Sequence, residues 1–540
     1  ATTDTTITVT ENSAWEYSIN GGAYQDSNEF TGLTANTAYS IAARVKATAT
    51  HNASAPCSAI SVTTAKGSAD AETQAKLKDS RKPYSGAYNG AAHGAFMEYA
   101  MPAGWTVKYS TDGINYSLAS REMIANMIEI HANATPFDAG VYLASCDKGM
   151  PANLMGLFRV NIPAVVVPGG TMNAGPEMLT LEQLGMYSAQ YERGEIDENR
   201  LNWAKHNACP SCGACSFIGT ASTMQIMAEA LGLALPGSAL MPATSPDLLN
   251  YAREAGKQAV KLAKMDNMRP SDIVTMDSFE NAILVHAAIS GSTNCLLHLP
   301  AIAHELGIEI TGDTFDRLHR GAKYLLDIRP AGKWPAECFY YAGGVPAIME
   351  EIKDHLHLDV MTVTGKTLGE NLKELKENGF YERCERWLQK FNERYGISIT
   401  RQDIIRPADK AIGTDGSIAI LRGNLAPEGA VIKHTACPKE MFKAVLKARP
   451  FDSEEECLDS VLKHEVEKGD AVFIRYEGPK GSGMPEMFYT SEAISSDKEL
   501  GKSIALITDG RFSGASTGPV IGHCSPEAVD GGPIALVEEG

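Results

Sequence analysis

The sequence lacks any apolar stretch long enough to cross a membrane. Its longest runs, such as Ile162–Val167, fall far short of the roughly 20 residues that a spanning helix needs. It also lacks a cluster of basic residues, and its 66 acidic against 48 basic residues leave a net charge of −18. Such a chain repels phosphate backbones, so we expect neither a membrane nor a nucleic acid as its partner. An anionic small molecule remains a candidate, because a metal ion or a local arginine can outweigh the global field.

Cysteine is scarce and unevenly placed. Eleven cysteines in 540 residues are too few for a disulfide scaffold, and three of them fall within Cys209–Cys215. The odd number and the local spacing favour a reducing compartment and ligation of a metal or cluster. The first residues show neither a basic region nor an apolar targeting segment, and we therefore predict a cytoplasmic protein.

The composition is that of an ordinary globular protein, with 44% hydrophobic and 21% charged residues. A length of 540 residues predicts two or three domains. Residues 1–66 differ from the rest in being rich in Thr, Ser, Ala and Asn, with short alternating runs and a hairpin signal at Asn20-Gly21-Gly22. This segment resembles a fragment of a fibronectin type III-like β-sandwich, with Leu33–Tyr39 similar to the tyrosine corner of that fold.

The remainder of the chain predicts two further domains. Residues 67–400 alternate helical spacing with continuous apolar runs, which favours an α/β domain with a mainly parallel sheet. The helical segments expected there are 121–132, 219–233 and 251–264, and the buried strands are 139–144 and 162–167. Residues 401–540 predict a β-rich domain with strands at 417–421, 471–476 and 503–507.

Two cysteine motifs are candidates for binding a metal. Cys146-Asp147-Lys148 follows a predicted strand, and sites in open α/β sheets lie at the carboxyl ends of strands. A thiolate, a carboxylate and an amine there could bind a cluster together with a hard cation, although the bare tripeptide also suits a buried Cys beside surface charges. Cys209–Cys215 leads into a predicted helix and suits iron–sulfur or zinc. A second CxxC pair, which a zinc ribbon needs, is absent.

Several loops carry polar groups after predicted strands. Glu477–Met487 is a Gly-rich loop with two carboxylates, and Thr508–Gly514 places Ser513 between glycines that let the backbone turn sharply. This serine could act as a base or nucleophile. Gly291–Asn294 could cradle an anion with its backbone N–H groups. We expect His286 and His298 to be core or supporting groups rather than ligands.

Taken together, these motifs resemble the dihydroxy-acid dehydratase / 6-phosphogluconate dehydratase family, which includes sugar-acid dehydratases. The resemblance covers roughly Ser117 to Gly540. The segments that carry it, in chain order, are 145–151, 167–170, 215–224, 291–299, 341–346, 426–429, 476–480, 508–514 and 521–528.

The resemblance implies an α/β N-terminal domain and a β-rich, swivelling C-terminal domain, commonly in a homodimer or higher homo-oligomer. It also implies an iron–sulfur cluster, of the 2Fe–2S or the 4Fe–4S type, and Mg²⁺. The residues matching the family's functional positions are Cys146 and Cys215 for the cluster, Asp147, Lys148 as a carbamate, Glu486 and Asp112 for Mg²⁺, and Ser513 as proton acceptor. A carbamate would turn the cationic amine into an anionic oxygen ligand for a hard ion.

The sequence departs from the family pattern upstream of Ser117. Asp112-Gly113-Ile114 runs almost directly into Ser117-Leu118, so part of the intervening family loop is absent. The family's block with a third cluster cysteine is not recognisable, and Cys57 is only a faint candidate for that role.

The resemblance implies a hydro-lyase that converts a 2,3-dihydroxy carboxylic acid to a 2-keto acid. Dihydroxy-acid dehydratase, an enzyme of branched-chain amino-acid biosynthesis, is favoured over an aldonic (sugar) acid dehydratase of the xylonate or gluconate type. A different class of function is a non-catalytic dehydratase remnant joined to a β-sandwich binding module. Iron and sulfide analysis would separate these two classes.

Overall fold

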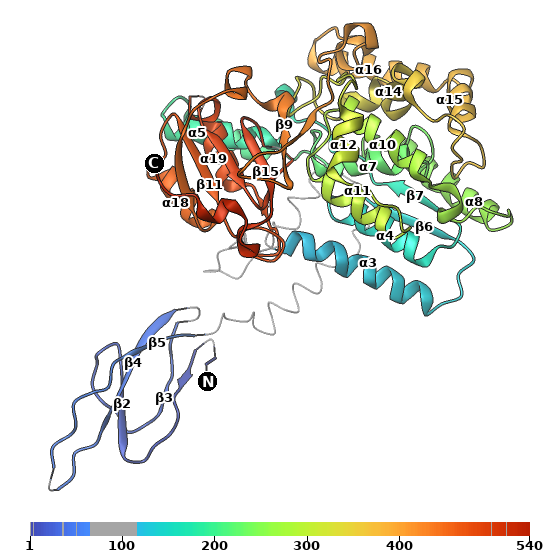
Figure 1. Cartoon of the computed structure of the whole chain (residues 1–540). Coiled ribbons are helices and arrows are strands. Elements are labelled where there is room, and N and C mark those ends of the chain that lie inside the picture. Colours follow the sequence, from blue (N-terminus) through green and yellow to red (C-terminus); the bar gives the residue numbers. More distant parts are fainter. Residues whose placement is uncertain are drawn as a thin grey trace. The chain divides into compact units, whose positions relative to one another are not determined.

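The computed structural model describes residues 2–64 and 116–540, apart from residues 4, 35, 36, 50, 498 and 515. The chain divides into two compact units, one of Ala1–Ala87 with Ala95–Lys108 and one of Tyr88–Gly94 with Tyr109–Gly540. Figure 1 shows the described parts of both units, coloured along the chain. Within these parts, no helix combines the length and the apolar character that a membrane crossing requires.

The described part of the N-terminal unit consists of antiparallel strands around a small core. The hairpin signal is confirmed, because Asn20 and Gly21 have positive φ of 51° and 70° and Gly22 N donates to Ile19 O at 2.9 Å. The main partner of the first hairpin strand is nevertheless a later strand. The sheets are β2-β4-β5 and β1-β3, with bounds β1 (Ile7–Thr8), β2 (Trp15–Ile19), β3 (Glu29–Phe30), β4 (Ala38–Val45) and β5 (Ile60–Thr63).

Tyr39 makes the contact that defines a tyrosine corner. Its Oη accepts a hydrogen bond from Thr34 N at 2.8 Å, which ties the side chain to backbone a few residues upstream. Ile7, Tyr17 and Ile41 are almost fully buried and form the centre of this unit's core. The β structure agrees with the prediction for this segment, whereas its likeness to fibronectin type III stays a prediction.

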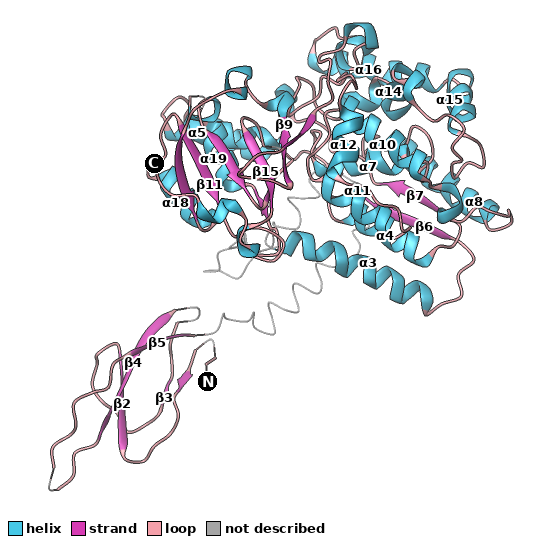
Figure 2. Ribbon diagram, viewed as in Figure 1, coloured by secondary structure: helices cyan, strands magenta, loops and turns pink. Residues whose placement is uncertain are grey.

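Residues 116–413 of the second unit form a mainly helical region. Two strands, β6 (Gly140–Ala144) and β7 (Ala164–Pro168), pair in parallel and are joined by α4 (Gly149–Val160). A single parallel bridge from Val166 to Ala234 extends this sheet. The pairing is parallel as predicted, but among the described residues the sheet is much smaller than the sequence suggests, and helices make up most of the region (Figure 2).

The helices of this region cover and surround the small sheet. Residues 401–413 belong to it by contact, since Arg406 N donates to Leu325 O and Ile412 N donates to Tyr324 O. The remaining helices are α3 (Ser117–Asn133), α5 (Leu184–Glu192), α6 (Glu198–Asn207), α7 (Thr220–Ala230), α8 (Pro246–Leu262), α9 (Pro270–Ile273), α10 (Met276–Ala288), α11 (Cys295–His304), α12 (Gly312–His319), α13 (Glu337–Tyr341), α14 (Gly344–Glu351), α15 (Leu368–Glu377), α16 (Phe380–Tyr395) and α17 (Arg401–Ile404).

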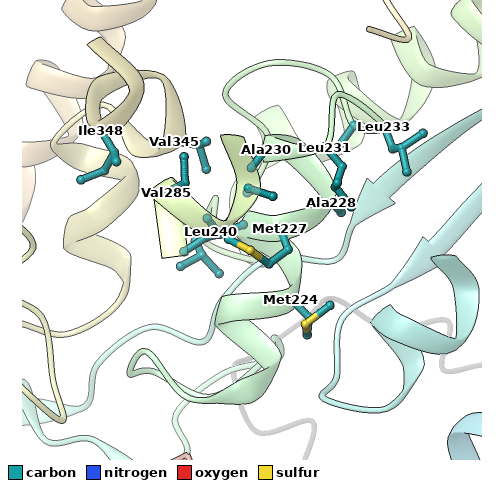
Figure 3. Close-up of a cluster of buried hydrophobic side chains, with 14 of the residues drawn as sticks. Met224, Met227, Ala228, Ala230, Leu231, Leu233, Leu240, Val285, Val345 and Ile348 are labelled. Carbon is teal, nitrogen blue, oxygen red and sulfur yellow. The ribbon is translucent and has the colours of Figure 1, made fainter. Parts of the chain in front are cut away.

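Helix α7 is the centre of the helical region. All of its residues are buried, and it contacts α4, α10, α11 and α14. Figure 3 shows Met224 and Met227 on this helix, with Val285 and Val345 from its neighbours. The surrounding helices fix the position of the N-terminus of α7. The loop that contains Cys215 leads into this N-terminus.

Residues 418–540 form a β-rich region, whereas the sequence analysis places the start of this region at residue 401. Its six-stranded sheet has the order β10-β11-β13-β15-β9-β8, parallel from β10 to β15 and antiparallel from β15 to β8. Helices α18 (Glu454–Leu462) and α19 (Tyr489–Ser496) contact each other, and α5 of the helical region packs against α19 (Figure 1). The strand bounds are β8 (Ile418–Leu421), β9 (Gly429–Lys433), β10 (Lys447–Phe451), β11 (Asp470–Ile474), β13 (Ala505–Thr508) and β15 (Val520–Ser525).

A two-stranded parallel pairing lies beside this sheet. It joins β12 (Glu486–Met487) to β14 (Arg511–Phe512), with Glu486 opposite Arg511 and Met487 opposite Phe512. The pairing brings together the two Gly-rich loops that the sequence singles out, and it continues directly into Ser513, whose N–H donates to Met487 O at 3.0 Å.

Candidate active site

The two predicted cluster cysteines lie in loops beside the parallel strands. Cys146 follows β6 and precedes α4, whereas Cys215 lies in the loop that leads into α7. That loop is fixed to the segment after β7, because Ala214 N donates to Gly170 O at 3.0 Å and Thr171 Oγ1 donates to Cys215 O at 3.0 Å. Neighbouring parallel strands therefore bring both thiols to the same edge of the sheet, where the sequence predicts Cys146.

The protein around both thiols disfavours their ionised, thiolate form when no metal cation is bound there. Burial raises the pKa of Cys215 to about 12, and the negative charges of Cys146 and Asp147 contribute further. Part of Cys146 is exposed, yet desolvation by the protein around its thiol and the Asp147 charge raise its pKa to about 11. Iron at this position would favour both thiolates, so the donor set fits an iron–sulfur cluster.

Lys148 lies between two carboxylates from different regions. Its Nζ donates to Asp147 Oδ2 at 2.7 Å and to Glu486 Oε2 at 3.1 Å, and only 5% of the residue is exposed. Burial opposes ionisation of Asp147, but the Lys148 and Arg511 cations outweigh it and lower the pKa of this carboxyl group. A positive charge is thus favoured between these oxygens, and such oxygen ligands suit Mg²⁺.

Arg511 is a site residue that the sequence motifs did not identify. Its side chain is fully buried, and its Nη1 donates to Glu486 Oε2 at 2.8 Å. The same guanidinium donates through Nε to Met484 O and through Nη2 to Ser117 Oγ at the start of α3. Arg511 therefore orients the Glu486 carboxylate and connects the β-rich region to the helical region.

Ser513 lines a small pocket of about 30 Å³. The glycine at 514 is needed for close approach rather than for positive φ: an added Cβ would lie 2.8 Å from Ser292 Oγ and 2.9 Å from Thr220 N. Gly510 likewise lies close to Glu477 O, where an added Cβ would be 2.6 Å away. Neither glycine has a positive φ: Gly514 lets the Ser513 loop pack against the N-terminus of α7, and Gly510 lets the chain pack against the backbone of Glu477.

The Gly291–Asn294 loop is a support and not the backbone anion cradle that its sequence suggests. Gly291 N donates to His286 O, Ser292 N to Thr223 Oγ1 and Asn294 N to Ser292 Oγ, so these N–H groups are satisfied within the protein. The Ser292 hydroxyl also contacts Thr220 Oγ1 at 2.9 Å. This hydroxyl network holds the surface on which the Ser513 loop rests.

Both histidines considered from the sequence are buried supporting groups. His286 Nε2 lies 3.0 Å from Ser292 O, and its Nδ1 lies 3.2 Å from His319 Nε2. His298 Nδ1 lies 3.2 Å from Arg121 Nη1, and its pKa is well below the usual value because of burial and the nearby Lys148 and Arg121 cations. A neutral imidazole in this position packs beside the charged site without adding charge to it.

Two candidate residues do not belong to the described part of the second unit. Asp112, the remaining predicted Mg²⁺ ligand, is outside the described residues. Cys57 belongs to the N-terminal unit, where its N–H donates to Ala43 O at 2.9 Å and its Sγ accepts from Ala43 N at 3.3 Å. Its role as a third cluster ligand stays a prediction.

Comparison with known proteins identifies the family. Residues 89–371 match the dihydroxy-acid/6-phosphogluconate dehydratase N-terminal model, and residues 403–540 match the corresponding C-terminal model. The chain is 45% identical over 434 residues to a dihydroxy-acid dehydratase of Solidesulfovibrio magneticus, covering 79% of this chain and 74% of that protein. It is 41% identical over 461 residues to a dihydroxy-acid dehydratase of Oleidesulfovibrio alaskensis, covering 83% of this chain and 78% of that protein.

A third relative shows the same extent of similarity. The dihydroxy-acid dehydratase of Caldicellulosiruptor bescii is 43% identical over 434 residues, which cover 79% of this chain and 74% of that protein. The matches span both regions that meet at Lys148 and Glu486. The resemblance recognised in the motifs is thereby confirmed, and the chain belongs to the dihydroxy-acid/6-phosphogluconate dehydratase family.

Proposed function

We propose that this chain is a hydro-lyase that removes water from a 2,3-dihydroxy carboxylic acid and releases a 2-keto acid, with dihydroxy-acid dehydratase as its activity. The observation that carries the proposal is the meeting of Lys148, two residues after Cys146, with Asp147 and with Glu486 of β12. This strand pairs with β14, which directly precedes Ser513. The relatives named above carry that same activity in their names.

The cofactors belong to the same proposal. Cys146 and Cys215 would hold an iron–sulfur cluster, and Asp147, Glu486 and Lys148 after carbamylation would hold Mg²⁺. When bound, these groups supply Lewis acidity toward the departing hydroxyl and toward the substrate oxygens. In forming the carbamate, the neutral Lys148 amine adds to CO₂ and loses a proton, which replaces a cation by an anionic oxygen ligand.

Ser513 is the group to which we assign proton removal. A serine hydroxyl is a poor base in water, and nearby positive charge is required to lower its pKa sufficiently. The C2 proton passes to Ser513, the C3 hydroxyl leaves with a proton as water, and the resulting enol takes up a proton at C3 to become the 2-keto acid. Overall, the reaction removes one water molecule, and the net oxidation state of the substrate does not change.

The assay compares substrates on anaerobically purified protein. We expect turnover of 2,3-dihydroxyisovalerate to exceed that of gluconate and xylonate. Faster turnover of a sugar acid would move the assignment to the aldonic acid branch. Protein that is free of iron and sulfide and inactive on all three acids, even after cluster reconstitution, would support a non-catalytic remnant instead.

The cellular setting is also a proposal. All eleven cysteines lie in the described part of the chain, and no disulfide joins any two of them there, which favours a reducing compartment such as the cytoplasm. The homo-oligomer implied by the resemblance stays a prediction.

A further inference from the structure

The helical region contains a pocket that the proposed chemistry does not use. Its volume is about 270 Å³, compared with about 30 Å³ for the space beside Ser513. Its walls come mainly from α13, α16 and the start of α8. The described residues that line it do not include any of the candidate cluster, metal or proton-transfer groups. The pocket is therefore a separate place where a small molecule could bind.

The inner wall of this pocket is aromatic. Tyr340 and Tyr341 at the end of α13 and Phe391 of α16 are no more than 7% exposed. Trp387 precedes Phe391 by about one turn, and its ring plane lies within 17° of that of Tyr341, with the ring centroids 6.4 Å apart. Planar apolar groups pack favourably against such rings. The wall therefore favours a ligand that contains a flat ring.

The outer part of the pocket carries two cations. Lys390 and Arg394 lie one helical turn apart on α16, and both are exposed to solvent. They share one face of this helix with Trp387 and Phe391, because side chains three and four residues apart are neighbours on a helix surface. Lys390 Nζ lies 4.4 Å from the centroid of the Trp387 ring, and Arg394 Nη2 donates to Ala174 O at 3.2 Å. Both charged groups are thus held beside the aromatic wall.

The lining of the pocket has a net positive charge, although the whole protein has a net charge of −18. Within the described part of the chain, neither of the two cations forms an ion pair with a carboxylate. Glu337 is the one carboxylate among the described lining residues. Its oxygens accept hydrogen bonds from Asn173 Nδ2, Ala174 N and Tyr341 Oη at 2.7–2.9 Å. These donors compensate the Glu337 charge, so both cations remain available to an anion.

We propose that this pocket binds a small organic anion in which a planar aromatic or heteroaromatic ring carries a carboxylate or phosphate group. The ring packs against Tyr341, Trp387 and Phe391, and the anionic group binds Lys390 and Arg394. Burial of the apolar ring contributes most of the affinity, whereas the ion pairs at the exposed rim select for negative charge. An aliphatic dihydroxy acid lacks the ring, so this ligand differs from the proposed substrate. The inference does not rest on the proposed function.

Calorimetry on the full chain with its cluster tests the proposal with two pairs of probes. Indole-3-acetate and AMP carry a carboxylate and a phosphate on a planar ring system, and indole-3-acetamide and adenosine are their uncharged counterparts. We expect wild type to bind at least one of the two anions, and to bind it more tightly than its counterpart. The preference should weaken at high salt, because the cations are exposed. The anion that binds more tightly identifies the recognised group.

Substitutions on α16 locate the site. The double variant Lys390→Gln/Arg394→Gln should lose roughly tenfold in affinity for the anion, with little change for the uncharged counterpart. Trp387→Leu should weaken both, because both use the ring. Arg386→Gln changes an exposed cation of the same helix that does not line this pocket, and this matched control should leave all affinities unchanged. Because both side chains changed in the double variant are exposed, we expect it to fold.

Four results would overturn the proposal. They are no binding of either anion at millimolar concentration, equal affinity for each anion and its counterpart, unchanged affinity in the double variant, and displacement of the bound anion by 2,3-dihydroxyisovalerate, which would place it in the candidate active site. We expect the double variant to turn over 2,3-dihydroxyisovalerate at the wild-type rate. Failure of this inference therefore leaves the proposed function intact, and an inactive wild type that still binds the anion refutes the proposed function alone.

Discussion

The helical region and the β-rich region contribute different chemistry to the site. The helical region provides two thiols and a carboxylate, Cys146, Cys215 and Asp147, from loops that follow parallel strands or enter a buried helix. The β-rich region provides a cation and a hydroxyl, Arg511 and Ser513, on a short paired strand and its extension. The candidate soft metal ligands thus lie in one region, and the proposed proton acceptor and the charge-orienting arginine lie in the other.

Hydrogen bonds run in both directions between the two regions, and the groups that make them differ in exposure. Lys148 of the helical region donates to Glu486 of the β-rich region, and Arg511 donates in the opposite direction to Ser117 Oγ. The Asp147 side chain is 31% exposed, whereas Glu486 is 11% exposed and Arg511 is fully enclosed. The β-rich side therefore presents rigid, desolvated groups to a more open ligand on the helical side. Neither region alone contains the full proposed site.

The largest effect is expected from replacing Cys215, a candidate cluster ligand in the helical region. Cys215→Ser should abolish the visible absorbance of the anaerobically purified protein and most of its iron and sulfide, because a serine hydroxyl is a much poorer iron ligand than a thiolate. Absorbance spectra and iron and sulfide assays measure this. Cys212→Ser, in the same loop, is the control; colour kept in Cys215→Ser but lost in Cys212→Ser would transfer the role to the other thiol.

A smaller loss is expected when the β-rich region loses its hydroxyl. Ser513→Ala should lower kcat by about 10²- to 10⁴-fold, the usual contribution of a positioned base, while cluster absorbance remains. Exchange of the substrate's C2 proton in D₂O, followed by NMR, should be lost together with dehydration. Ser503→Ala changes a hydroxyl that bonds to Glu499 O away from the pocket and serves as control. Near-normal C2 exchange in Ser513→Ala would remove Ser513 from proton transfer.

The sequence predicts the parts of this site that are local along the chain. Cys146, Asp147 and Lys148 are adjacent, and the position of a strand before them is sufficient to place them at a sheet edge. Ser513 is similarly placed by the strand before it. The role of Arg511 is not local, because it depends on the pairing of β12 with β14. Composition does not reveal this pairing.

The predicted types of secondary structure are correct, but the relative amounts of helix and sheet differ from the prediction. The helix predicted over 219–233 is present as α7, and the strands predicted at 139–144 and 162–167 are present as β6 and β7. Continuous apolar runs indicate buried strands but do not give the number of strands in a sheet, and the described sheet is smaller than the expected one. The reason for Gly514 was also missed, because the contact with Thr220 and Ser292 joins segments far apart in sequence.

The smallest effect should come from the ion that would join the two regions. Asp147 and Lys148 lie on one side and Glu486 on the other, so Mg²⁺ held by all three would bind only the folded protein and stabilise it. The expected gain is about 2.7 kcal/mol at a hundredfold excess over the Kd, seen as a higher Tm in millimolar Mg²⁺ than in Mg²⁺-free buffer. Glu486→Gln should reduce this Mg²⁺-dependent shift, whereas Glu499→Gln, at a carboxylate whose side chain is 87% exposed, should preserve it. The Tm of each variant is compared with and without Mg²⁺. This comparison separates the stabilisation by the ion from the stability that is lost when Arg511 is left without its buried carboxylate partner. A wild-type Tm that does not respond to Mg²⁺ would contradict a metal site at this junction and leave the two regions joined by their buried cations alone.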